Sequence, residues 1–403
     1  MRKMKDSGIE WIGEIPEDWK LVKYKNFTIN GMGNTILQTE LVDEGIPVYS
    51  STKDNKIFGY IKEPQIKLSK GDLVISARGT IGCSKLIKDE LATCTQTTIY
   101  SHVHGINNLY LYYCTIGLKE YWFAFDKTAI PQITVRQVDN NIVPVPSIEE
   151  QELIADYLDN KVKEIDNIIS KTKETIEEYK KYKQSVITEA VTKGLNPNVK
   201  MKDSGIEWIG KIPEDWGIVK VKQIFDIGRG RVISKLELDD DGKYPVYSSQ
   251  TKNNGCLGYI KSFDYDTDQL TWTTDGANAG TIFLRKGKYN CTNVCGTLSP
   301  KHKYYNLNYL KYDLEYITFF HKRADTNGFK IMNNEMAEIK ILYPSLEEQE
   351  LIADYLDKKV KKIDNLISKK QELITQLEQY KKSLIYEYVT GKKEVSVSYA
   401  DWL

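Results

Sequence analysis

Two long stretches of the chain carry a heptad pattern of apolar side chains. Apolar residues recur at alternating steps of four and three over 158–190 and again over 356–388. This spacing keeps one stripe of an α-helix apolar, which is typical of a coiled coil. Before each stretch a serine precedes a glutamate by three residues, and a glycine follows each stretch, as helix ends favour. The pattern predicts helices within 147–195 and 345–391, each on the order of 65 Å long.

A lysine interrupts the apolar stripe at the same place in both helices, at Lys183 and at Lys381. A charged residue there either fixes the register of the helices or marks where they part. The simplest partner for each stripe is the other helix, running antiparallel within the same chain. The candidate subunit-interface residues, all on these stripes, are Leu158, Ile165, Ile169, Leu356, Ile363 and Ile367.

The rest of the chain alternates short apolar runs with glycine, tyrosine, threonine and asparagine. Such runs predict short strands joined by loops, with some helix. The candidate elements are strands at 72–77, 141–145, 269–273 and 338–342 and a helix near 107–125.

The chain is one unit of about 198 residues written twice. Residues 4–19 and 201–216 differ at one position, and residues 146–171 and 344–369 differ at four. A period this long indicates duplicated domains rather than a solenoid. The material between these repeated segments has diverged heavily, so we interpret the chain as two different recognition surfaces in one common frame.

The predicted fold class is α+β, with an internal pseudo-two-fold repeat. Two α/β domains, at 1–146 and 196–344, are separated by two long antiparallel coiled-coil helices, and a short tail covers 392–403. Each helix leads from one domain to the other, so the prediction is a domain at either end of a rigid spacer.

Composition indicates a globular, cytoplasmic protein. Hydrophobic residues make up 41% and charged residues 28% of the chain, no apolar run approaches a membrane span, and the start lacks an apolar signal stretch. The six cysteines are scattered, which favours reduced, partly buried thiols over a zinc site. We therefore expect no metal and no membrane partner.

Charge narrows the class of partner. The 56 basic and 56 acidic residues cancel, which argues against non-specific coating of nucleic acid and leaves room for a local basic surface. Six of the seven arginines lie in the divergent regions. The planar guanidinium suits bidentate contact with guanine or phosphate. Two different surfaces at a fixed separation fit duplex DNA read at two half-sites.

Polar loops supply the candidate DNA contacts. Residues 47–55 match 245–254, and 76–82 correspond to 273–282, where a shared Gly-Thr-Ile predicts a common turn. Arginine pairs well with guanine, asparagine with adenine, and aspartate accepts from cytosine. The candidates are Ser50, Ser51, Thr52, Lys53, Arg78, Thr80, Arg229, Arg231, Ser249, Gln250, Lys252, Asn253, Asp275, Asn278, Lys322 and Arg323.

Two alternatives of other classes remain. A nuclease acting alone would need a carboxylate followed by Glu-x-Lys; Asp325 with 338–340 fits, but the first repeat has Asn-Asn-Ile at 140–142. An assembly scaffold that binds only proteins would fit the zero net charge. The chain lacks the Asn/Asp-Pro-Pro-aromatic loop that adenine methyl transfer requires, so we assign it no catalytic residues.

The chain resembles the specificity subunit of type I restriction-modification systems. The motifs that carry the resemblance are KDSGIEWIGEIPEDW at the start of each repeat, Arg78-Gly-Thr-Ile-Gly, and P-S-x-E-E-Q-E-L-I-A-D-Y-L-D at the start of each long helix. One departure is the early Gly-Gly-x-Thr-Pro of the family, which reads NGMGNT at 30–35 and GRGRVI at 228–233.

The resemblance implies a function. Each of the two domains would be a target recognition domain that reads one half of a bipartite double-stranded DNA target. The helices would set the gap and dock two methyltransferase subunits. Two translocase-nuclease restriction subunits would complete the complex. The chain itself would bind no cofactor, whereas the complex would use S-adenosylmethionine for adenine methylation and ATP with magnesium for restriction.

Overall fold

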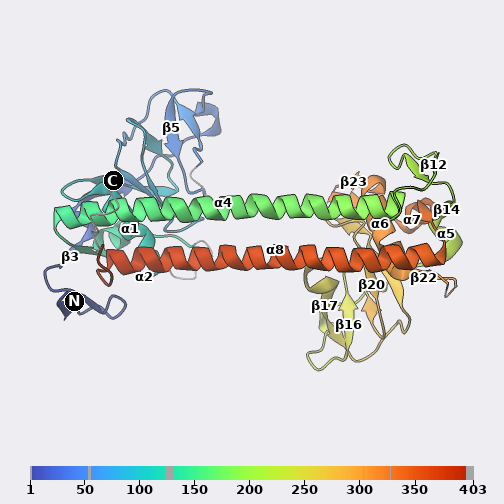
Figure 1. Cartoon of the computed structure of the whole chain (residues 1–403). Coiled ribbons are helices and arrows are strands. Elements are labelled where there is room, and N and C mark those ends of the chain that lie inside the picture. The colour runs from blue at the N-terminus through green and yellow to red at the C-terminus, as the bar shows by residue number, and fades with distance from the viewer. Residues whose placement is uncertain (1, 53–55, 124–130, 303, 327, 396–403) are drawn as a thin grey trace. The chain divides into compact units, whose positions relative to one another are not determined.

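The chain folds into two compact units that share two long helices. A computed structural model describes residues 2–52, 56–123, 131–302, 304–326 and 328–395. Unit 1 joins the residues up to Lys173 with those from Lys370 onward, and unit 2 is Glu174–Lys369. Each unit therefore takes one part of α4 (Ile148–Lys193) and one part of α8 (Leu346–Val389), the helices predicted from the heptads (Figure 1).

Unit 1 is built around a four-stranded antiparallel sheet, in the order β4-β10-β7-β8. A smaller sheet has the order β6-β5-β9, in which β5 and β9 are parallel, and β1-β2 and β11-β3 form two-stranded ribbons. The strands are β1 Met4–Asp6, β2 Glu14–Pro16, β3 Lys20–Lys23, β4 Thr28–Met32, β5 Ile46–Tyr49, β6 Gly59–Ile61, β7 Leu73–Ser76, β8 Ser84–Leu86, β9 Thr93–Cys94, β10 Thr98–Val103 and β11 Ile142–Val145. The short helices are α1 Asn108–Gly117, α2 Lys119–Trp122 and α3 Val135–Asn140, with 3-10 turns at Tyr24–Asn26 and Gln38–Glu40.

Unit 2 repeats this plan. Its four-stranded sheet is β15-β22-β18-β20, its mixed sheet is β17-β16-β21, and β19-β24-β23 forms a further three-stranded sheet. The strands are β12 Met201–Asp203, β13 Lys211–Pro213, β14 Gly217–Lys220, β15 Phe225–Arg229, β16 Tyr244–Tyr247, β17 Cys256–Ile260, β18 Gln269–Thr273, β19 Asp275–Gly276, β20 Ile282–Arg285, β21 Asn290–Cys291, β22 Cys295–Pro300, β23 Arg323–Asp325, β24 Gly328–Lys330 and β25 Lys340–Tyr343. The helices are α5 Val221–Ile224, α6 Leu307–His321 and α7 Asn333–Glu338, with 3-10 turns at Lys235–Glu237 and Lys252–Gly255.

The α+β class is therefore the one predicted, and most predicted elements are confirmed. β7, β11, β18 and α1 fall at the expected places. The strand predicted at 338–342 is β25, which begins two residues later because α7 still occupies Glu338. The boundaries predicted for the recognition domains stay predictions, since each compact unit extends past the domain into both long helices.

Both long helices begin and end with local signals from the sequence. The backbone N–H of Glu150 donates to Ser147 Oγ, and that of Glu348 to Ser345 Oγ, at 3.3 Å in each case. At the other ends Gly194 and Gly391 adopt φ of +73° and +68°, a left-handed conformation that glycine adopts without a Cβ penalty.

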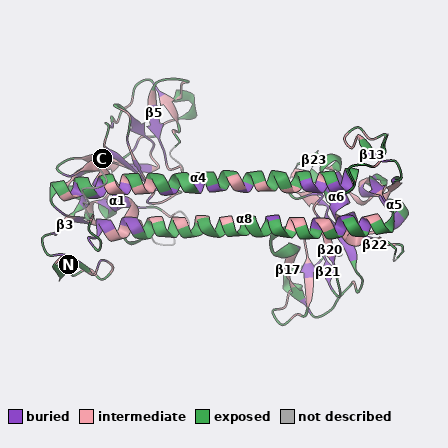
Figure 2. Ribbon diagram, in the orientation of Figure 1, coloured by how far each residue is buried: buried purple, intermediate pink, exposed green. Residues whose placement is uncertain are grey.

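The predicted apolar stripes are buried inside each unit. In unit 1, α4 supplies residues such as Ile165 and Ile169, and the end of α8 supplies Leu384 and Tyr388. In unit 2 the end of α4 and the start of α8 contribute in the same way. Figure 2 shows these buried positions recurring on one side of each helix. Within each unit the two helix segments are therefore antiparallel and packed through their stripes.

Candidate nucleic-acid interface

The repeated tryptophan motif clamps helix ends in each unit. The indole N–H of Trp19 donates to Glu150 Oε2 at 3.0 Å, at the start of α4, and the ring lies against Gly391 at the end of α8. In unit 2 Trp216 donates to Glu348 at 2.8 Å and lies against Gly194. In each unit the motif therefore contacts the start of one long helix and the end of the other, which gives the repeated segments a structural role.

A second matched contact ties the divergent parts to this frame. Tyr113 on α1 donates to Asp159 on α4 (3.3 Å), and Tyr312 on α6 donates to Asp357 on α8 (2.8 Å). The side-chain oxygen of Gln151 accepts a hydrogen bond from the backbone N–H of Asn107, which caps the N-terminus of α1. Gln349 accepts one in the same way from Asn306, which caps α6. Each recognition surface is thus supported by the same side chains on the long helices.

The structure brings the candidate loops of unit 1 together. The hydroxyl of Thr80, after β7, donates to the backbone oxygen of Ser51 at 2.9 Å, after β5. Ser50 is buried, and its hydroxyl accepts from Thr95. Arg78 is exposed, and its Nε donates to Gln132 Oε1 at 3.1 Å. Unit 1 therefore presents Arg78 beside a compact group of hydroxyl side chains.

Several residues of unit 1 need separate comment. Thr52 accepts from Lys85 Nζ at 2.6 Å and donates to the backbone oxygen of Lys56. Lys53 lies outside the described residues. Lys85 and Gln132 are contacts that the sequence did not reveal, because a lysine within a short strand and a loop glutamine carry no distinctive pattern.

In unit 2 a row of half-buried and exposed charged residues crosses a small sheet. Asp275 on β19 pairs with Lys330 on β24, and Lys330 pairs in turn with Arg323 on β23. Arg229 reaches the same edge, with Nη2 3.4 Å from Thr274 Oγ1 and 3.9 Å from Asp275 Oδ2. The structure thereby collects three predicted residues, and Lys330 is a fourth that the sequence did not reveal.

Arg78 and Asp275 occupy equivalent positions. Ala77 precedes Arg78, and its backbone N–H donates to the backbone oxygen of Thr97, just before β10. Thr274 precedes Asp275, and its backbone N–H donates in the same way to Val294, just before β22. Arg78 also bridges to Gln132 as Asp275 pairs with Lys330. One position of the common plan therefore carries a cation in unit 1 and a carboxylate in unit 2.

Both units contain the predicted turn, but the predicted alignment of its Gly-Thr-Ile residues is wrong. The N–H of Gly82 donates to Ser76 O, and that of Gly280 donates to Thr273 O. Both glycines have positive φ, +70° and +86°. Gly82 therefore corresponds to Gly280, whereas the Gly-Thr-Ile match would have paired Gly79 with Gly280. The coincidence of three letters hid a difference in loop length.

Other candidates of unit 2 are held by neighbours. Arg231 is bound by Glu237 (2.9 Å) and Asp264 (3.0 Å), and these carboxylates raise its pKa. The Nε of Arg323 lies 2.7 Å from Glu335. The ammonium of Lys322 lies over the rings of two phenylalanines.

The loop after β16 contains the remaining candidates. Ser249 is half-buried, whereas Lys252 and Asn253 are exposed, and Asn253 adopts a φ of +49°. The side-chain amide of Gln250 donates to the backbone oxygen of Cys256. Asn278, in the turn after β19, also has an exposed side chain.

The nuclease candidate is part of an ion-pair cluster. Lys220 and Lys222 lie 2.6 and 2.5 Å from the carboxylate of Glu338, and their hydrogen bonds lower the pKa of Glu338 to about 2. Asp325 pairs with Lys330 at 3.2 Å. Both carboxylates therefore have cationic partners in the fold. Among the residues that the structure describes, no group of three His, Cys, Asp or Glu side chains is arranged to hold a metal ion.

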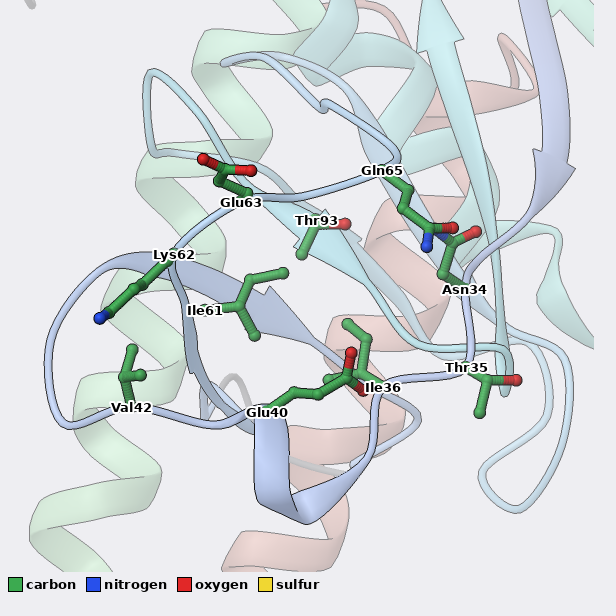
Figure 3. Close-up of a pocket in the computed structure, with 10 residues that line it drawn as sticks. All are labelled: Asn34, Thr35, Ile36, Glu40, Val42, Ile61, Lys62, Glu63, Gln65 and Thr93. Carbon is green, nitrogen blue, oxygen red and sulfur yellow. The ribbon is translucent and has the colours of Figure 1, made fainter.

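A cavity of about 370 Å³ in unit 1 lies beside residues 30–35, where the sequence differs from the Gly-Gly-x-Thr-Pro motif (Figure 3). Asn34 donates to Gln65 at 2.6 Å on its wall. Glu40 and Glu63 line it together with Lys62. Two carboxylates and one ammonium make it a poor site for a phosphate, so we assign no DNA contact there.

The residues chosen as subunit-interface candidates serve the interior. Five of the six, Leu158, Ile165, Ile169, Leu356 and Ile363, are buried, and Ile367 is half-buried. Four of them, Leu158, Ile165, Ile169 and Leu356, belong to the hydrophobic cores of the two units. A surface for another subunit has to be sought on the exposed sides of the helices, and the prediction of such a surface remains untested.

Thiols and helices add two further observations. The six cysteines are free, and four of them are buried, as expected for reduced thiols. None of the helices in the described ranges is both long and apolar enough to cross a membrane.

Comparison with known proteins identifies the family. A model of the type I restriction modification DNA specificity domain matches residues 16–178 and 213–378, one copy for each repeat. The chain belongs to this family. Both matches run from the tryptophan motif into a long helix, so they include both partners of the Trp19–Glu150 and Trp216–Glu348 hydrogen bonds.

Relatives agree with this assignment. A putative type I specificity subunit of Mycoplasma pneumoniae is 32% identical over 261 residues, which cover 64% of this chain and 88% of the relative. The specificity subunit of the type I restriction enzyme MjaVIII from Methanocaldococcus jannaschii is 27% identical over 413 residues, which cover 94% of each chain.

Solved structures show the same fold. A chain from a structure concerning complex assembly and conformational transition of the type I R-M system matches with a TM-score of 0.70 at 14% identity, covering 94% of this chain and 99% of that one. The HsdS subunit from Thermoanaerobacter tengcongensis matches with a TM-score of 0.50 at 14% identity, covering 94% and 98%.

Proposed function

We propose that this chain is the DNA-reading subunit of a type I restriction-modification complex, and that each unit reads one half of a bipartite target. The observation that carries the proposal is the pairing of a common frame with different polar surfaces. The frame contacts of Trp19 and Trp216 are equivalent, whereas one equivalent position carries an exposed Arg78 in unit 1 and a half-buried Asp275 in unit 2.

The chemistry of these positions suits base reading. An exposed guanidinium can donate two hydrogen bonds to guanine, and a carboxylate can accept from cytosine. In unit 2 the neighbouring cations Arg229, Lys330 and Arg323 would contact phosphates, which position a protein on DNA without reading sequence. The two units would therefore prefer different half-sites.

The long helices would set the unread gap between the half-sites and dock the partner subunits. We place the docking surface on exposed apolar residues that recur in both repeats rather than on the buried stripes. Unit 1 exposes Leu153, Ile168 and Tyr380, and unit 2 exposes Leu351, Leu366 and Tyr182 at the matching positions. Leu153 and Ile168 lie within about 60° of each other around α4 and outside the stripe, at 100° per residue. The same surface presented twice fits two copies of one partner, the methyltransferase subunit.

The remaining activities would reside in the partners. The methyltransferase subunits would use S-adenosylmethionine to methylate adenine, and two restriction subunits would use ATP with magnesium. This chain would supply sequence selection and would carry no catalytic residue itself. The complex would act on DNA in the cytoplasm.

The test is the adenine-methylation pattern of the host genome with and without this gene. The proposal predicts loss of one split motif that is methylated in both halves. No lost motif, from a complex that nevertheless assembles, would contradict it and favour a protein scaffold. Binding of the complex to its target should also weaken steeply as salt rises, because phosphate contacts release counterions. A scaffold that binds only proteins would not show this slope on DNA.

A further inference from the structure

Each unit buries a cation against the loop that follows one strand of its mixed sheet. This strand is β5 in unit 1 and β16 in unit 2. Lys85 on β8 is 3% exposed, and Arg285 on β20 is 1% exposed. β8 and β20 are the equivalent edge strands of the two four-stranded sheets. Lysine and arginine are among the residues least often fully buried, because removing a charge from water is costly unless it is paired. Two such burials at matching places call for a reason.

In unit 1 the buried ammonium holds the backbone of the candidate loop. Lys85 Nζ donates to the backbone oxygen of Ser50 at 3.0 Å and to Thr52 Oγ1 at 2.6 Å. Ser51, between them, accepts from Thr80 of the neighbouring candidate loop. The lysine therefore fixes the first residues of one loop, and through Ser51 the position of the other.

In unit 2 the guanidinium does the same with more contacts. Arg285 Nε donates to Thr271 Oγ1 on β18 at 3.1 Å, and Nη1 donates to the backbone oxygen of Asn254 at 2.6 Å. The guanidinium carbon lies 3.6 Å from the ring centroid of Tyr247 and 4.2 Å from that of Phe283. Burial lowers the pKa of Arg285.

The loop over Arg285 is shaped around it. Asn253 and Asn254 adopt positive φ, +49° and +52°, which non-glycine residues seldom do. Gly255 follows with φ +78°, and a Cβ there would come within 2.8 Å of Arg285 Nη2. This Nη2 is itself buried and has no hydrogen-bond partner among the described residues. The contact between Arg285 and the backbone oxygen of Asn254 is therefore formed despite an unusual loop backbone and one unsatisfied donor on the guanidinium.

The two cations are not the same inherited residue. Lys85 pairs across the sheet with Val74, and the residue at that place in unit 2 is Phe283, opposite Thr271. Arg285 lies two residues further along its strand, on the same face of the sheet. The units thus reach the same arrangement with different residues, which indicates a requirement of the loop rather than a remnant of duplication.

We propose that Lys85 and Arg285 are positioning residues for sequence reading, Lys85 holding residues 50–52 and Arg285 holding residues 253–255 in the conformation that contacts DNA. This inference rests on the proposed DNA-reading function. Neither side chain touches a base. Removing either cation would release the loop carbonyls, and discrimination would fall only at the half-site read by that unit.

The experiment uses the full chain assembled with its methyltransferase subunit. Methylation is measured on oligonucleotides with the intact target and with single base changes in each half. Lys85→Met should lower discrimination in one half on the order of tenfold, which corresponds to the loss of about 1.4 kcal/mol, and Arg285→Met should do so in the other half. Lys88→Met and Lys286→Met, which alter exposed neighbours on the same segments, should leave both halves unchanged.

Thermal unfolding of each variant separates positioning from loss of fold. If a methionine variant does not fold, Lys85→Arg or Arg285→Lys decides, because these keep the charge and change the geometry of the donors. Discrimination that stays unchanged in both halves, or falls equally in both, would overturn the inference. A wild-type complex that shows no sequence preference would overturn the proposed function together with it.

Discussion

Lys183 Nζ on α4 lies 2.8 Å from Oδ1 of Asp364 on α8, and Lys381 and Asp166 make the same contact in unit 1 at 2.5 Å. Each lysine interrupts an apolar stripe, yet reaches across to the other helix segment of its own unit. This geometry favours a role in fixing register over a place where the helices part. A slip by one residue would separate both pairs.

Reversing the Lys183–Asp364 pair tests this role. Asp364→Lys should lower the free energy of unfolding, and the added Lys183→Asp should restore most of the loss. The coupling should stay below about 1 kcal/mol because both side chains are partly exposed. Urea denaturation of the wild type, both single variants and the double variant gives the coupling. A value of zero would leave the lysines without a pairing role.

The tryptophan clamps predict an asymmetry between the units. Trp19→Phe and Trp216→Phe remove the same ring volume and the same N–H. Glu150, however, keeps Arg2 as a second donor, and the corresponding residue in unit 2 is Val199. Trp216→Phe should therefore destabilise the chain more, by about 1 kcal/mol, the usual size of a hydrogen bond to a partly buried group.

Differential scanning calorimetry of the two phenylalanine variants measures this difference. Glu348→Gln, which keeps an acceptor for the Trp216 indole, is the control and should cost less than Trp216→Phe. Equal losses in the two phenylalanine variants would show that ring packing alone holds the helix ends.

A buried carboxyl makes the stability of unit 2 depend on pH. Asp313 on α6 is fully buried, and burial raises its pKa well above the usual range. In unit 1 Cys114 occupies the same position of α1. The unfolded chain ionises this aspartate at its ordinary pKa, whereas the folded chain resists ionisation. This residue therefore lowers stability progressively as pH rises above about 4, up to its folded pKa.

Asp313→Cys should remove that dependence. The advantage of the variant over the wild type should be small near pH 5 and larger near pH 7.5, as measured by urea denaturation at both pH values. Leu342 N–H loses its acceptor in the variant, which sets a constant cost independent of pH. Parallel stability curves for the two proteins would contradict the assignment of a raised pKa to Asp313.

The exposed apolar residues of the long helices predict where the methyltransferase binds. Leu153→Glu and Leu351→Glu should each reduce the number of methyltransferase subunits retained from two to one, and the double variant should retain none. Leu373 is also exposed, but its counterpart in the other repeat is Thr175, so Leu373→Glu is the matched control. Native mass spectrometry of the co-expressed complexes counts the subunits. Full retention by the double variant would exclude this surface.

The sequence predicted features that depend on local or periodic signals. The heptad stripes, the serine starts and the glycine ends located both long helices, since each signal acts within a few residues. The polar loops around Ser51 and Thr80 were also found, and they do meet in the fold. The shared Gly-Thr-Ile paired Gly280 with Gly79 instead of Gly82, because sequence similarity alone does not reveal a change in loop length.

Other features depend on contacts between distant residues. Nothing local in the sequence shows that Lys85 and Arg285 are buried, because their burial depends on a loop more than 30 residues away. The same holds for the row of Asp275, Lys330 and Arg323, which strand pairing assembles. The apolar stripes alone did not show which partner covers them, so the interface candidates on the stripes stay a prediction.

The most direct test replaces one recognition surface by the other within the frame. In this chimera a second copy of residues 20–145 replaces residues 217–343. The junctions lie at equivalent strand ends, because the inserted segment runs from β3 to β11 and the removed one from β14 to β25. Tyr113 of the inserted copy would then face Asp357 as the original Tyr113 faces Asp159. The methylated motif of the assembled complex is then read by sequencing modified genomic DNA. We predict a split motif whose two halves are inverted copies of the half-site of unit 1. Methylation of the original asymmetric motif would contradict it, as would an assembled, folded complex that methylates no motif.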